Sequence, residues 1–554
     1  MYIVTTALPY ANGDIHLGHI LEHIQADIYV RRLRQSYKDV YFCGADDSHG
    51  TAIVLAAEKE GINPKELIKR SMERHYEDIS GFGVEYDNYY TTHSEENLEL
   101  VKYAYSKLVS NDLIEKRTIQ QLYDSEKEMF LPDRFVKGEC PKCHSQEQYG
   151  DNCDSCGATY EAYELINPKS VLTGATPVLK ETEHLFLKTK MKRKFLRDWS
   201  LLGLGARMNK SAEARFAEWV GDGEANLKDW CISRDAPYFG FKIPNEENKY
   251  FYVWMDAPFG YFASYKNLCD KGGAEAYNFD GSRKDVQLIH FIGKDILRFH
   301  TVFWPIVLDT AGMILPNKII SHGFITVNGE KMSKSKGTFI TARKYLDSGI
   351  DPELLRYYLA SKMNNNERDI NFDIEDFVNS VNNELIGKII NIPSRLASVI
   401  NKVYGGRILN PLSYESMIDD PFQFSCLSSI ENIQILINSC NYANAVSNAL
   451  KFADKINARV EEIKVWEAMS EDCSDSRKES IHDHCSEMLI LMLLLFKALS
   501  PIMPKLYNRV LEFMNISNPK APYKEIPEDG HYINAYEHLH KRLVLSEVKA
   551  KLLD

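Results

Sequence analysis

Residues 3–19 read IVTTALPYANGDIHLGH, and this stretch predicts the kind of sheet around which the chain folds. A β-branched run gives way at Pro9 to the pair Asn12-Gly13, which favours a tight turn, and a helical pattern begins near Asp14. We expect Asp14 to cap that helix. The order of strand, loop and helix is typical of an α/β unit in a parallel sheet.

Two histidines flank a glycine at the start of the predicted helix. Gly18 leaves no side chain between His16 and His19, so a polyphosphate can approach the first turn, where the helix dipole favours an anion. From the composition of the chain, chance predicts only about 0.02 copies of His-x-Gly-His. Two histidines on an ordinary surface helix are the alternative interpretation.

Lysines cluster between two glycines far along the chain, where residues 329–338 read GEKMSKSKGT. We call these residues the lysine loop. A cation-rich loop of this kind can move and can place ammonium groups on a leaving pyrophosphate. A solvated basic turn is the alternative, but it does not explain why the loop accompanies the histidine pattern.

Four of the eleven cysteines are close together, at Cys140, Cys143, Cys153 and Cys156. Two Cys-x-x-Cys pairs can place four thiolates tetrahedrally around a soft divalent ion, and zinc suits four sulfurs best. Because protein ligands fill all four positions, we expect one structural zinc ion. Four thiols without metal are the alternative, and the scattered remaining cysteines fit a reducing compartment.

Length, charge and hydropathy limit the classes of protein that this chain can represent. A chain of 554 residues is too long for one core, so we expect three or more structural units. The net charge of −12 argues against indiscriminate nucleic-acid binding, which needs clustered cations. The start lacks the basic region of a secretory signal, and the longest apolar run, residues 488–496, is too short to span a bilayer, so we expect a cytoplasmic protein.

Changes in the hydrophobic pattern divide the chain into six segments. Short strands alternate with amphipathic helices in residues 1–115 and 229–335, which we expect to form the two halves of a Rossmann-type, doubly wound parallel sheet domain. The remaining segments are an insertion with the cysteines (116–228), a connecting unit with the lysine loop at its start (336–373), an α-helical bundle (374–535) and an amphipathic helix that packs back on the body (536–554).

The histidine pattern and the lysine loop together resemble the two signature motifs of class I aminoacyl-tRNA synthetases, which activate an amino acid with ATP and join it to tRNA. Other stretches narrow the resemblance to the methionine-specific family of this class. They are ADDSHG (45–50), RDAPYFG (234–240), WMDAP (254–258), VNGEKMSKS (327–335) and the four cysteines in the insertion. The similarity runs from residue 2 to the C-terminus, and it implies that the helical bundle binds the anticodon.

The resemblance implies a methionine pocket. Asp47 would hold the ammonium group of the amino acid, Arg234 would lie near its carboxylate, and Leu8 and Tyr261 would meet the thioether. The other residues that it implies as walls are Ala7, Tyr10, Trp254, Pro258, Ile296 and His300.

The resemblance also implies the reaction. The methionine carboxylate attacks the α-phosphate of ATP, with Mg²⁺ helping, and methionine then passes from the adenylate to the 3′-terminal adenosine of initiator and elongator tRNA(Met). His16 and His19 would stabilise the α-phosphate in the transition state, and Lys331 and Lys334 the β- and γ-phosphates. The implied nucleotide site also includes Asn12, Gly18, Gly293, Asp295 (on the ribose), Ser333 and Ser335.

For the tRNA anticodon, the resemblance implies contacts from Asn391, Arg395 and Trp466. A cytosine of a CAU anticodon can stack on the indole while the other two side chains read its edge. Pro393 removes a helical hydrogen bond and should kink this helix. We expect a monomer, because nothing after the bundle resembles the additional C-terminal domain of some relatives.

Three other functions remain open from the sequence. A cysteine-specific synthetase should hold its substrate on an active-site zinc, whereas the four cysteines here close their own site. An inactive tRNA-binding relative would not need the charged groups that both signature motifs retain. A simple nucleotidyltransferase would explain the histidine pattern but not the lysine loop or the helical bundle.

Overall fold

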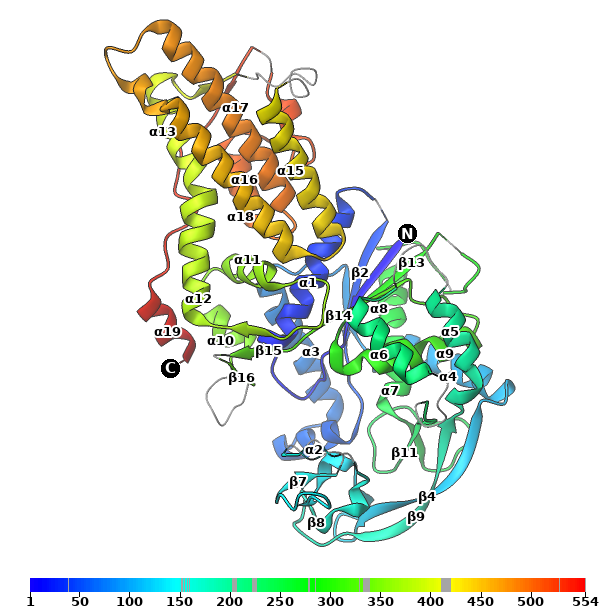
Figure 1. The fold of residues 1–554 in the computed structure, drawn as a ribbon. Coiled ribbons are helices and arrows are strands. Elements are labelled where there is room, and N and C mark those ends of the chain that lie inside the picture. The colour runs from blue at the N-terminus through cyan, green and yellow to red at the C-terminus, as the bar shows by residue number, and fades with distance from the viewer. Residues whose placement is uncertain are drawn as a thin grey trace.

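The computed structural model describes residues 1–553 except for residues 38, 151, 152, 154, 157, 159, 202–206, 222–226, 278, 284, 328, 332–338, 410–419 and 528. Within the described chain, a body built on a parallel sheet carries a long helical bundle on one side and a curved β-rich insertion on another (Figure 1). The α1 helix lies between the sheet and the bundle.

A five-stranded parallel sheet forms the centre of the body. Its order is β14 (Lys318–His322), β13 (Gln287–Gly293), β1 (Tyr2–Thr6), β2 (Val40–Asp46) and β3 (Asn88–Thr91). Every neighbouring pair is parallel. The first strand of the sequence is therefore the middle strand of the sheet, which confirms the predicted doubly wound α/β fold.

Successive residues of the strands bury opposite faces of the sheet. Val4 of β1 belongs to a buried cluster with α1 (Leu17–Arg34), whereas Ile3 belongs to a second cluster with helices on the other face. That second layer includes α4 (Glu95–Ser110), α8 (Phe259–Asp270) and α9 (Trp304–Thr310). This alternation explains why the strands are apolar on both sides, as a sheet covered by two helical layers requires.

The insertion is built on a long antiparallel ribbon of β4 (Ile114–Asp124) and β9 (Val178–Leu187), extended by β5 (Met129–Phe130) and β10 (Trp230–Cys231). A small sheet at the end of the insertion comprises β6 (Val136–Glu139), β7 (Gln148–Tyr149) and β8 (Ile166–Ser170). This small sheet carries the cysteine cluster.

The other elements of the body connect these layers. They are α2 (Thr51–Glu60), α3 (Pro64–Gly81), α5 (Arg193–Leu201), α6 (Lys210–Val220), β11 (Ser233–Asp235), β12 (Lys249–Phe251), α7 (Val253–Asp256), β15 (Ile325–Val327), β16 (Glu330–Lys331), α10 (Ala342–Asp347), α11 (Pro352–Lys362) and β17 (Ile370–Phe372).

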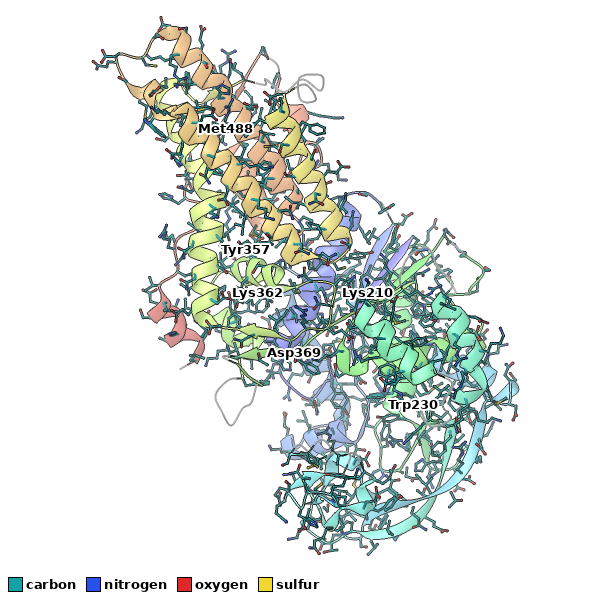
Figure 2. All side chains as sticks on the ribbon, in the orientation of Figure 1. Lys210, Trp230, Tyr357, Lys362, Asp369 and Met488 are labelled. Carbon is teal, nitrogen blue, oxygen red and sulfur yellow. The ribbon has the colours of Figure 1, made fainter. Side chains whose placement is uncertain are left out.

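The helical bundle shares its core with one face of the sheet. Its helices are α12 (Ile374–Asn379), α13 (Asn391–Val403), α15 (Pro421–Asn438), α16 (Tyr442–Ile463), α17 (Asp475–Leu499) and α18 (Pro504–Phe513). The α15 helix packs on α1, and α16 packs on α11. Met488, in the apolar run of α17, is buried inside the bundle (Figure 2).

The helix around Pro393 departs from regular α-helical geometry. A π-helix, η7, covers Ser380–Ile390, and the α-helical pattern resumes in α13 two residues before the proline. The N–H of Asn391 bonds to the carbonyl of Ile386, five residues back. Pro393 has no N–H to donate to the carbonyl of Ile389, which lies in the last turn of this π-helix.

The expected C-terminal helix is shorter than predicted. It begins at Leu545 and forms α19 (Leu545–Leu553), which packs on α10 and α12. Residues 536–544 are irregular instead of helical. Their backbone groups bond to distant side chains, because Arg509 donates to the carbonyl of Leu539 and Asn382 bonds both the N–H and the carbonyl of Leu543.

Among the described residues, no helix combines the length and the apolar character needed to cross a membrane.

Candidate functional site

The two histidines of the signature pattern cap their own helix. His16 is the N-cap of α1, and its Nδ1 accepts a hydrogen bond from the N–H of Gly18 at 3.1 Å. The Nδ1 of His19 accepts in turn from the N–H of His16 at 3.3 Å. The expectation that Asp14 caps this helix is wrong, because Asp14 pairs with Arg74 instead.

These caps decide which ring nitrogens carry protons. Because each Nδ1 accepts a hydrogen bond, each neutral ring must carry its proton on Nε2. Burial lowers the pKa of His16 to about 4, and it also lowers the pKa of His19. The rings stack with their centroids 3.8 Å apart. The helix therefore presents two neighbouring Nε2–H donors beside its positive end, which suits an anionic oxygen.

His75 of α3 holds the turn that precedes this helix. Its Nδ1 lies 2.8 Å from the Asp46 carboxylate, and its Nε2 lies 2.6 Å from the carbonyl oxygen of Gly13. Both nitrogens face acceptors, which favours the protonated form of the ring. Although burial alone would lower the pKa of His75, the contacts with Asp46 and Gly13 raise it. The sequence did not reveal this role, which depends on α3 reaching the end of β2.

The chain that leaves the lysine loop is bonded directly to the start of α1. The N–H of Leu17 donates to the carbonyl of Ile340 at 3.2 Å, and the N–H of Ala342 donates to the carbonyl of Ile15 at 2.8 Å. The segment that follows the lysine loop, residues 340–342, therefore lies beside the start of α1, although the two are far apart in sequence. Of the lysine loop itself, Lys334, Ser333, Ser335 and the side chain of Lys331 lie outside the described residues.

A cavity of about 90 Å³ opens beside the carboxyl ends of β1 and β2. Most of the predicted methionine-pocket residues line it, and Ala257 and Phe299 were missed although they are sequence neighbours of predicted residues. The full lining is Ala7, Leu8, Asp47, Trp254, Ala257, Pro258, Tyr261, Ile296, Phe299 and His300.

One polar pair in the cavity wall is internally satisfied. The Nδ1 of His300 lies 3.1 Å from the carbonyl of Ile296, and its Nε2 lies 2.8 Å from the hydroxyl of Tyr261. Burial lowers the pKa of His300 to about 4, so the ring is neutral. His300 therefore donates to Ile296 and accepts from Tyr261, which leaves no free proton for a strong acceptor in the cavity. That environment suits a weakly polar group such as a thioether.

One oxygen of the Asp47 carboxylate, in contrast, is unsatisfied. The Oδ1 atom is buried and has no hydrogen-bond partner among the described residues, whereas a backbone hydrogen bond from His49 reaches the carboxylate. Burial raises the pKa of this carboxyl, and the carboxyl of Asp256 raises it further. The backbone is fixed because the N–H of Asp47 donates to Pro9 and its carbonyl accepts from Ala11. A carboxylate with one buried, unpaired oxygen at a cavity wall is suited to bind a cation. It does not cap α2, whose N-cap is Gly50.

Two predicted pocket residues lie outside the cavity lining. The hydroxyl of Tyr10 occupies the space that a Cβ at Gly50 would need. The Arg234 guanidinium lies 3.7 Å from the ring centroid of Tyr252, whose ring in turn packs 5.7 Å from that of Trp254. Arg234 therefore does not line the cavity itself, and Tyr252 and Trp254 lie between its guanidinium and the cavity.

The predicted ribose-binding residues lie at the end of β13. Gly293 closes this strand, and a Cβ there would displace the carboxylate of Asp295. Asp295 is exposed just beyond it, and Asn12 is exposed on the signature turn. Nearby, His322 bridges Glu22 at 3.1 Å and the carbonyl of Gly323 at 2.7 Å, a pairing that the sequence did not indicate.

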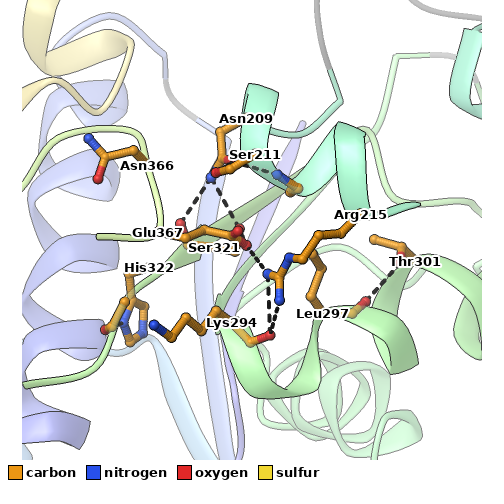
Figure 3. Close-up of polar contacts among 12 residues, drawn as sticks. Asn209, Ser211, Arg215, Lys294, Leu297, Thr301, Ser321, His322, Asn366 and Glu367 are labelled. Atoms are coloured by element: carbon orange, nitrogen blue, oxygen red, sulfur yellow. Dashed lines mark hydrogen bonds and ion pairs between the residues drawn. The ribbon is translucent and has the colours of Figure 1, made fainter. Parts of the chain in front are cut away.

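A polar network connects three segments of the chain near the end of β13 (Figure 3). Asn209, at the start of α6, donates to the carbonyl of Ser321 at 3.1 Å. The hydroxyl of Ser321 donates to Glu367 at 2.7 Å, and Glu367 pairs with Arg215. Arg215 also reaches the carbonyl of Lys294, next to Asp295. The network joins α6, the sheet and the segment before β17. No local sequence pattern predicted these contacts.

The four cysteines converge as the sequence predicts. The sulfur atoms of Cys140, Cys143, Cys153 and Cys156 all lie within 4.8 Å of one another. Backbone N–H groups of Cys143 and Cys156 point at sulfur, at 3.5 Å and 3.4 Å. About 3.8 Å separates sulfurs that share a tetrahedral zinc ion with Zn–S bonds near 2.3 Å, so the arrangement fits that ion.

Two of the three predicted anticodon residues lie close together. The α13 helix, which carries Arg395, lies at the end of the bundle remote from the sheet (Figure 1). The Arg395 guanidinium lies 6.0 Å from the ring centroid of Trp466, which is 41% exposed on the short helix Val465–Met469. Arg395 is also paired with Glu461 at 2.5 Å. Asn391 is exposed one turn earlier on α13.

Comparisons with known proteins agree with this geometry. A family model described as class I tRNA synthetases (M) matches residues 2–397. The methionine–tRNA ligase of Neisseria meningitidis serogroup A is 45% identical over 552 residues, which cover 99% of this chain and 79% of that protein. The methionine–tRNA ligase of Burkholderia ambifaria is 46% identical over 554 residues, which cover 99% of this chain and 75% of that protein.

Solved structures show the same fold. The crystal structure of Mycobacterium tuberculosis methionyl-tRNA synthetase bound by methionyl-adenylate superposes with a TM-score of 0.76 at 20% identity, covering 97% of this chain and 99% of that chain. The ligand-free form of that enzyme gives a TM-score of 0.70 at 19% identity. From the family model and the two ligases together, this chain belongs to the methionine–tRNA ligase family of class I tRNA synthetases.

Proposed function

We propose that the crevice at the carboxyl ends of β1, β2 and β13 activates L-methionine with ATP. The products are methionyl-adenylate and pyrophosphate, and methionine then passes to the 3′-terminal adenosine of tRNA(Met). The observation that carries this proposal is the unpartnered Oδ1 of the Asp47 carboxylate at the wall of a small cavity. That cavity lies next to the strand-to-helix turn that presents two imidazole N–H donors.

Methionine recognition follows from the cavity wall. Asp47 binds the ammonium group, and the neutral pair of Tyr261 and His300 lies against the thioether. Because hydrogen bonds to a thioether are weak, selectivity comes mainly from the shape of the apolar walls. Arg234 attracts the carboxylate electrostatically, from behind Tyr252 and Trp254.

The chemical step needs no nucleophile from the enzyme. The Nε2–H groups of His16 and His19 donate to the α-phosphate oxygens as negative charge builds on them, and the positive end of α1 supports the same charge. Lys331 and Lys334 neutralise the pyrophosphate, and Asp295 holds the ribose. Mg²⁺ bound with ATP supplies further charge neutralisation on the phosphates.

The four-cysteine cluster holds one zinc ion with a structural role, because its four sulfurs leave no position open for water or substrate. Replacing Cys153 with serine should lower the zinc content from about one ion per chain to nearly none and loosen the small sheet of the insertion. Metal analysis after gel filtration, together with limited proteolysis of the insertion, tests this. The matched control is Cys269→Ser, and full zinc content in Cys153→Ser would contradict the proposal.

The exposed surface of Trp466 and Arg395 reads the anticodon of the tRNA. Trp466→Ala should raise KM for tRNA by about 5- to 150-fold, because stacking of a base on an aromatic ring contributes about 1–3 kcal/mol. Amino-acid activation without tRNA should be unchanged. The exposed Met469, on the same short helix, offers a control as Met469→Ala. An unaltered KM for tRNA in Trp466→Ala would remove the indole from this role.

We also propose that the protein acts as a monomer in the cytoplasm. Sedimentation of the purified chain tests the monomer, and a stable dimer would contradict it.

Methionine-dependent ATP–pyrophosphate exchange tests the main proposal. The assay is run across the twenty amino acids with Mg²⁺ and without tRNA. Exchange driven by methionine far above the others is the expected result. Exchange driven by another amino acid would overturn the pocket assignment, and absence of exchange would favour an inactive tRNA-binding protein.

A further inference from the structure

Cys231 lies in a cluster of charged side chains beside the methionine site. It ends the short strand β10, directly after Trp230 (Figure 2), and its thiol is partly exposed. The Nη1 of Arg234 lies 3.5 Å from its sulfur and donates to the carbonyl of Ser233 at 2.7 Å. A guanidinium held at this distance favours the negatively charged form of the thiol.

A histidine approaches the same sulfur from the insertion. The side chain of His184, on β9, lies near enough to the thiol to lower its pKa. The Nδ1 of this ring also lies 2.8 Å from the hydroxyl of Ser233, and its Nε2 lies 3.3 Å from Asp235. Asp235 is paired in turn with Lys249 of β12. Cys231 is therefore surrounded by a histidine–carboxylate pair and an arginine, an environment typical of reactive cysteines.

These contacts distinguish Cys231 from other thiols of the chain. Although burial raises the pKa of Cys231, the approach of His184 and the charge of Arg234 lower it to about 7. At five other cysteines outside the four-cysteine cluster, burial dominates and raises the pKa of the thiol: Cys43, Cys269, Cys426, Cys440 and Cys485.

The cluster is connected to the methionine cavity by packed rings. Arg234 stacks on Tyr252 at 3.7 Å, the ring of Tyr252 lies 5.7 Å from that of Trp254, and Trp254 lines the cavity. Trp230, next to Cys231, also packs on Trp254 with ring centroids 5.8 Å apart. A change in charge or volume at the Cys231 sulfur therefore reaches the cavity wall through two short routes.

We propose that Cys231 is a thiolate that serves as the counter-ion of Arg234, and that hydroperoxides oxidise it reversibly and thereby interrupt methionine activation. This inference rests on the proposed role of Arg234 at the methionine carboxylate. Cys231 is a positioning residue, because it acts through Arg234 and not on the substrate.

The oxidation step is a two-electron transfer. The thiolate sulfur attacks the outer oxygen of the hydroperoxide, an S–O bond forms, and the O–O bond breaks. Sulfur is oxidised to sulfenic acid, the peroxide is reduced, and the departing alkoxide or hydroxide takes a proton from solvent. A low-molecular-weight thiol restores the cysteine by forming a mixed disulfide with loss of water, and a second thiol then reduces that disulfide.

The first experiment measures the thiolate directly. Zinc-loaded protein is alkylated with iodoacetamide at pH values from 6 to 9, and the rate at each cysteine is read from its peptide by mass spectrometry. The rate at Cys231 should rise about tenfold between pH 6 and pH 8 and then level off, as for a thiol with a pKa near 7. The comparison is Cys269, also partly exposed, whose rate should keep rising through pH 9. A Cys231 profile like that of Cys269 would overturn the thiolate assignment, whatever the enzyme's activity.

The second experiment tests the consequence of oxidation. Hydrogen peroxide should raise KM for methionine at least several-fold in ATP–pyrophosphate exchange, leave KM for ATP within about twofold, and lose its effect after dithiothreitol. Cys231→Asp provides a counter-ion that cannot be oxidised, and Cys231→Ser is a smaller, neutral change. The ratio of treated to untreated KM should remain near one in both variants. A peroxide effect that persists in these variants, or sulfenylated Cys231 with an unchanged KM, would overturn the proposed link to methionine activation.

The two experiments separate a failure of the proposed function from a failure of the Cys231 proposal. If untreated protein shows no methionine-dependent exchange, the assigned function fails, whereas the alkylation profile still decides whether Cys231 is a thiolate.

Discussion

Replacing Asp47 by asparagine is expected to lower kcat/KM for methionine in ATP–pyrophosphate exchange by about 100- to 1,000-fold. The carboxylate Oδ1 is buried without a partner among the described residues, so the substrate ammonium is the group that would compensate its charge. Removing one member of a buried charge pair costs about 3–5 kcal/mol, because the other charge remains desolvated and unpaired. Asparagine keeps the shape of the side chain, so the loss reports the charge.

The pH dependence of the same reaction provides a second measurement on Asp47. Only the ionised carboxylate attracts an ammonium group, and burial raises the pKa of this carboxyl above its ordinary value. We therefore expect kcat/KM for methionine to increase as the pH rises through that pKa and then to level off. The part of this acidic limb that belongs to Asp47 should be absent in Asp47→Asn.

A substrate analogue supplies the matched control. 4-(Methylthio)butanoate retains the thioether and the carboxylate of methionine but lacks the ammonium group. The wild-type enzyme should prefer methionine strongly over this analogue, and Asp47→Asn should lose most of that preference. Equal discrimination by the two proteins would show that the ammonium binds elsewhere.

Replacing Arg356 by methionine is expected to lower the free energy of unfolding by about 3–5 kcal/mol. Arg356, on α11, is fully buried, and its Nη2 lies 2.7 Å from the carboxylate of Asp27, which is also buried. The same guanidinium donates to the carbonyls of Pro501 and Ile502 at 2.9 Å and 2.8 Å, between α17 and α18. It also donates to the carbonyl of Phe82 at the end of α3. One side chain therefore joins the sheet body, the connecting unit and the bundle.

Urea unfolding followed by circular dichroism measures this effect. The matched control is Arg34→Met, which removes a partly exposed pair with Asp87 and should cost less than about 1 kcal/mol. The double variant Arg356→Met/Asp27→Asn should lose less stability than the sum of the two single variants, because each single variant already removes the pair between these two residues. A change in Arg356→Met no larger than in Arg34→Met would contradict the expected role of Arg356.

The family of the chain and much of its fold could be predicted from local patterns. The run from Ile3 to His19 indicates a strand, a turn and a helix because β-branched residues, Asn-Gly and helical spacing act over a few neighbouring residues. The spacing of the two Cys-x-x-Cys pairs likewise predicts that their four sulfur atoms come together. Local signals were less reliable at ends of elements, where His16, and not Asp14, caps α1, and where the last helix begins at Leu545.

The tertiary structure alone decided the electrostatics of the crevice. Although burial alone would lower the pKa of His75, that pKa is raised because α3 brings the ring between Asp46 and the carbonyl of Gly13, which lie in different elements. His322 and Glu22, 300 positions apart, form a buried pair where β14 meets α1. Protonation depends on burial and on neighbouring charges within a few ångströms, and these neighbours come from distant parts of the chain.

The same distinction applies to Cys231. As one of several scattered cysteines it carried no signal in the sequence. Although burial raises the pKa of its thiol, the approach of His184 and Arg234 lowers that pKa. The sequence by itself therefore determined the family from short motifs, and the resemblance to that family indicated most residues that line the small cavity. Folding decided which charges are buried, paired or left without a partner, because a carboxylate, imidazole or thiol acquires its chemistry from the elements that enclose it.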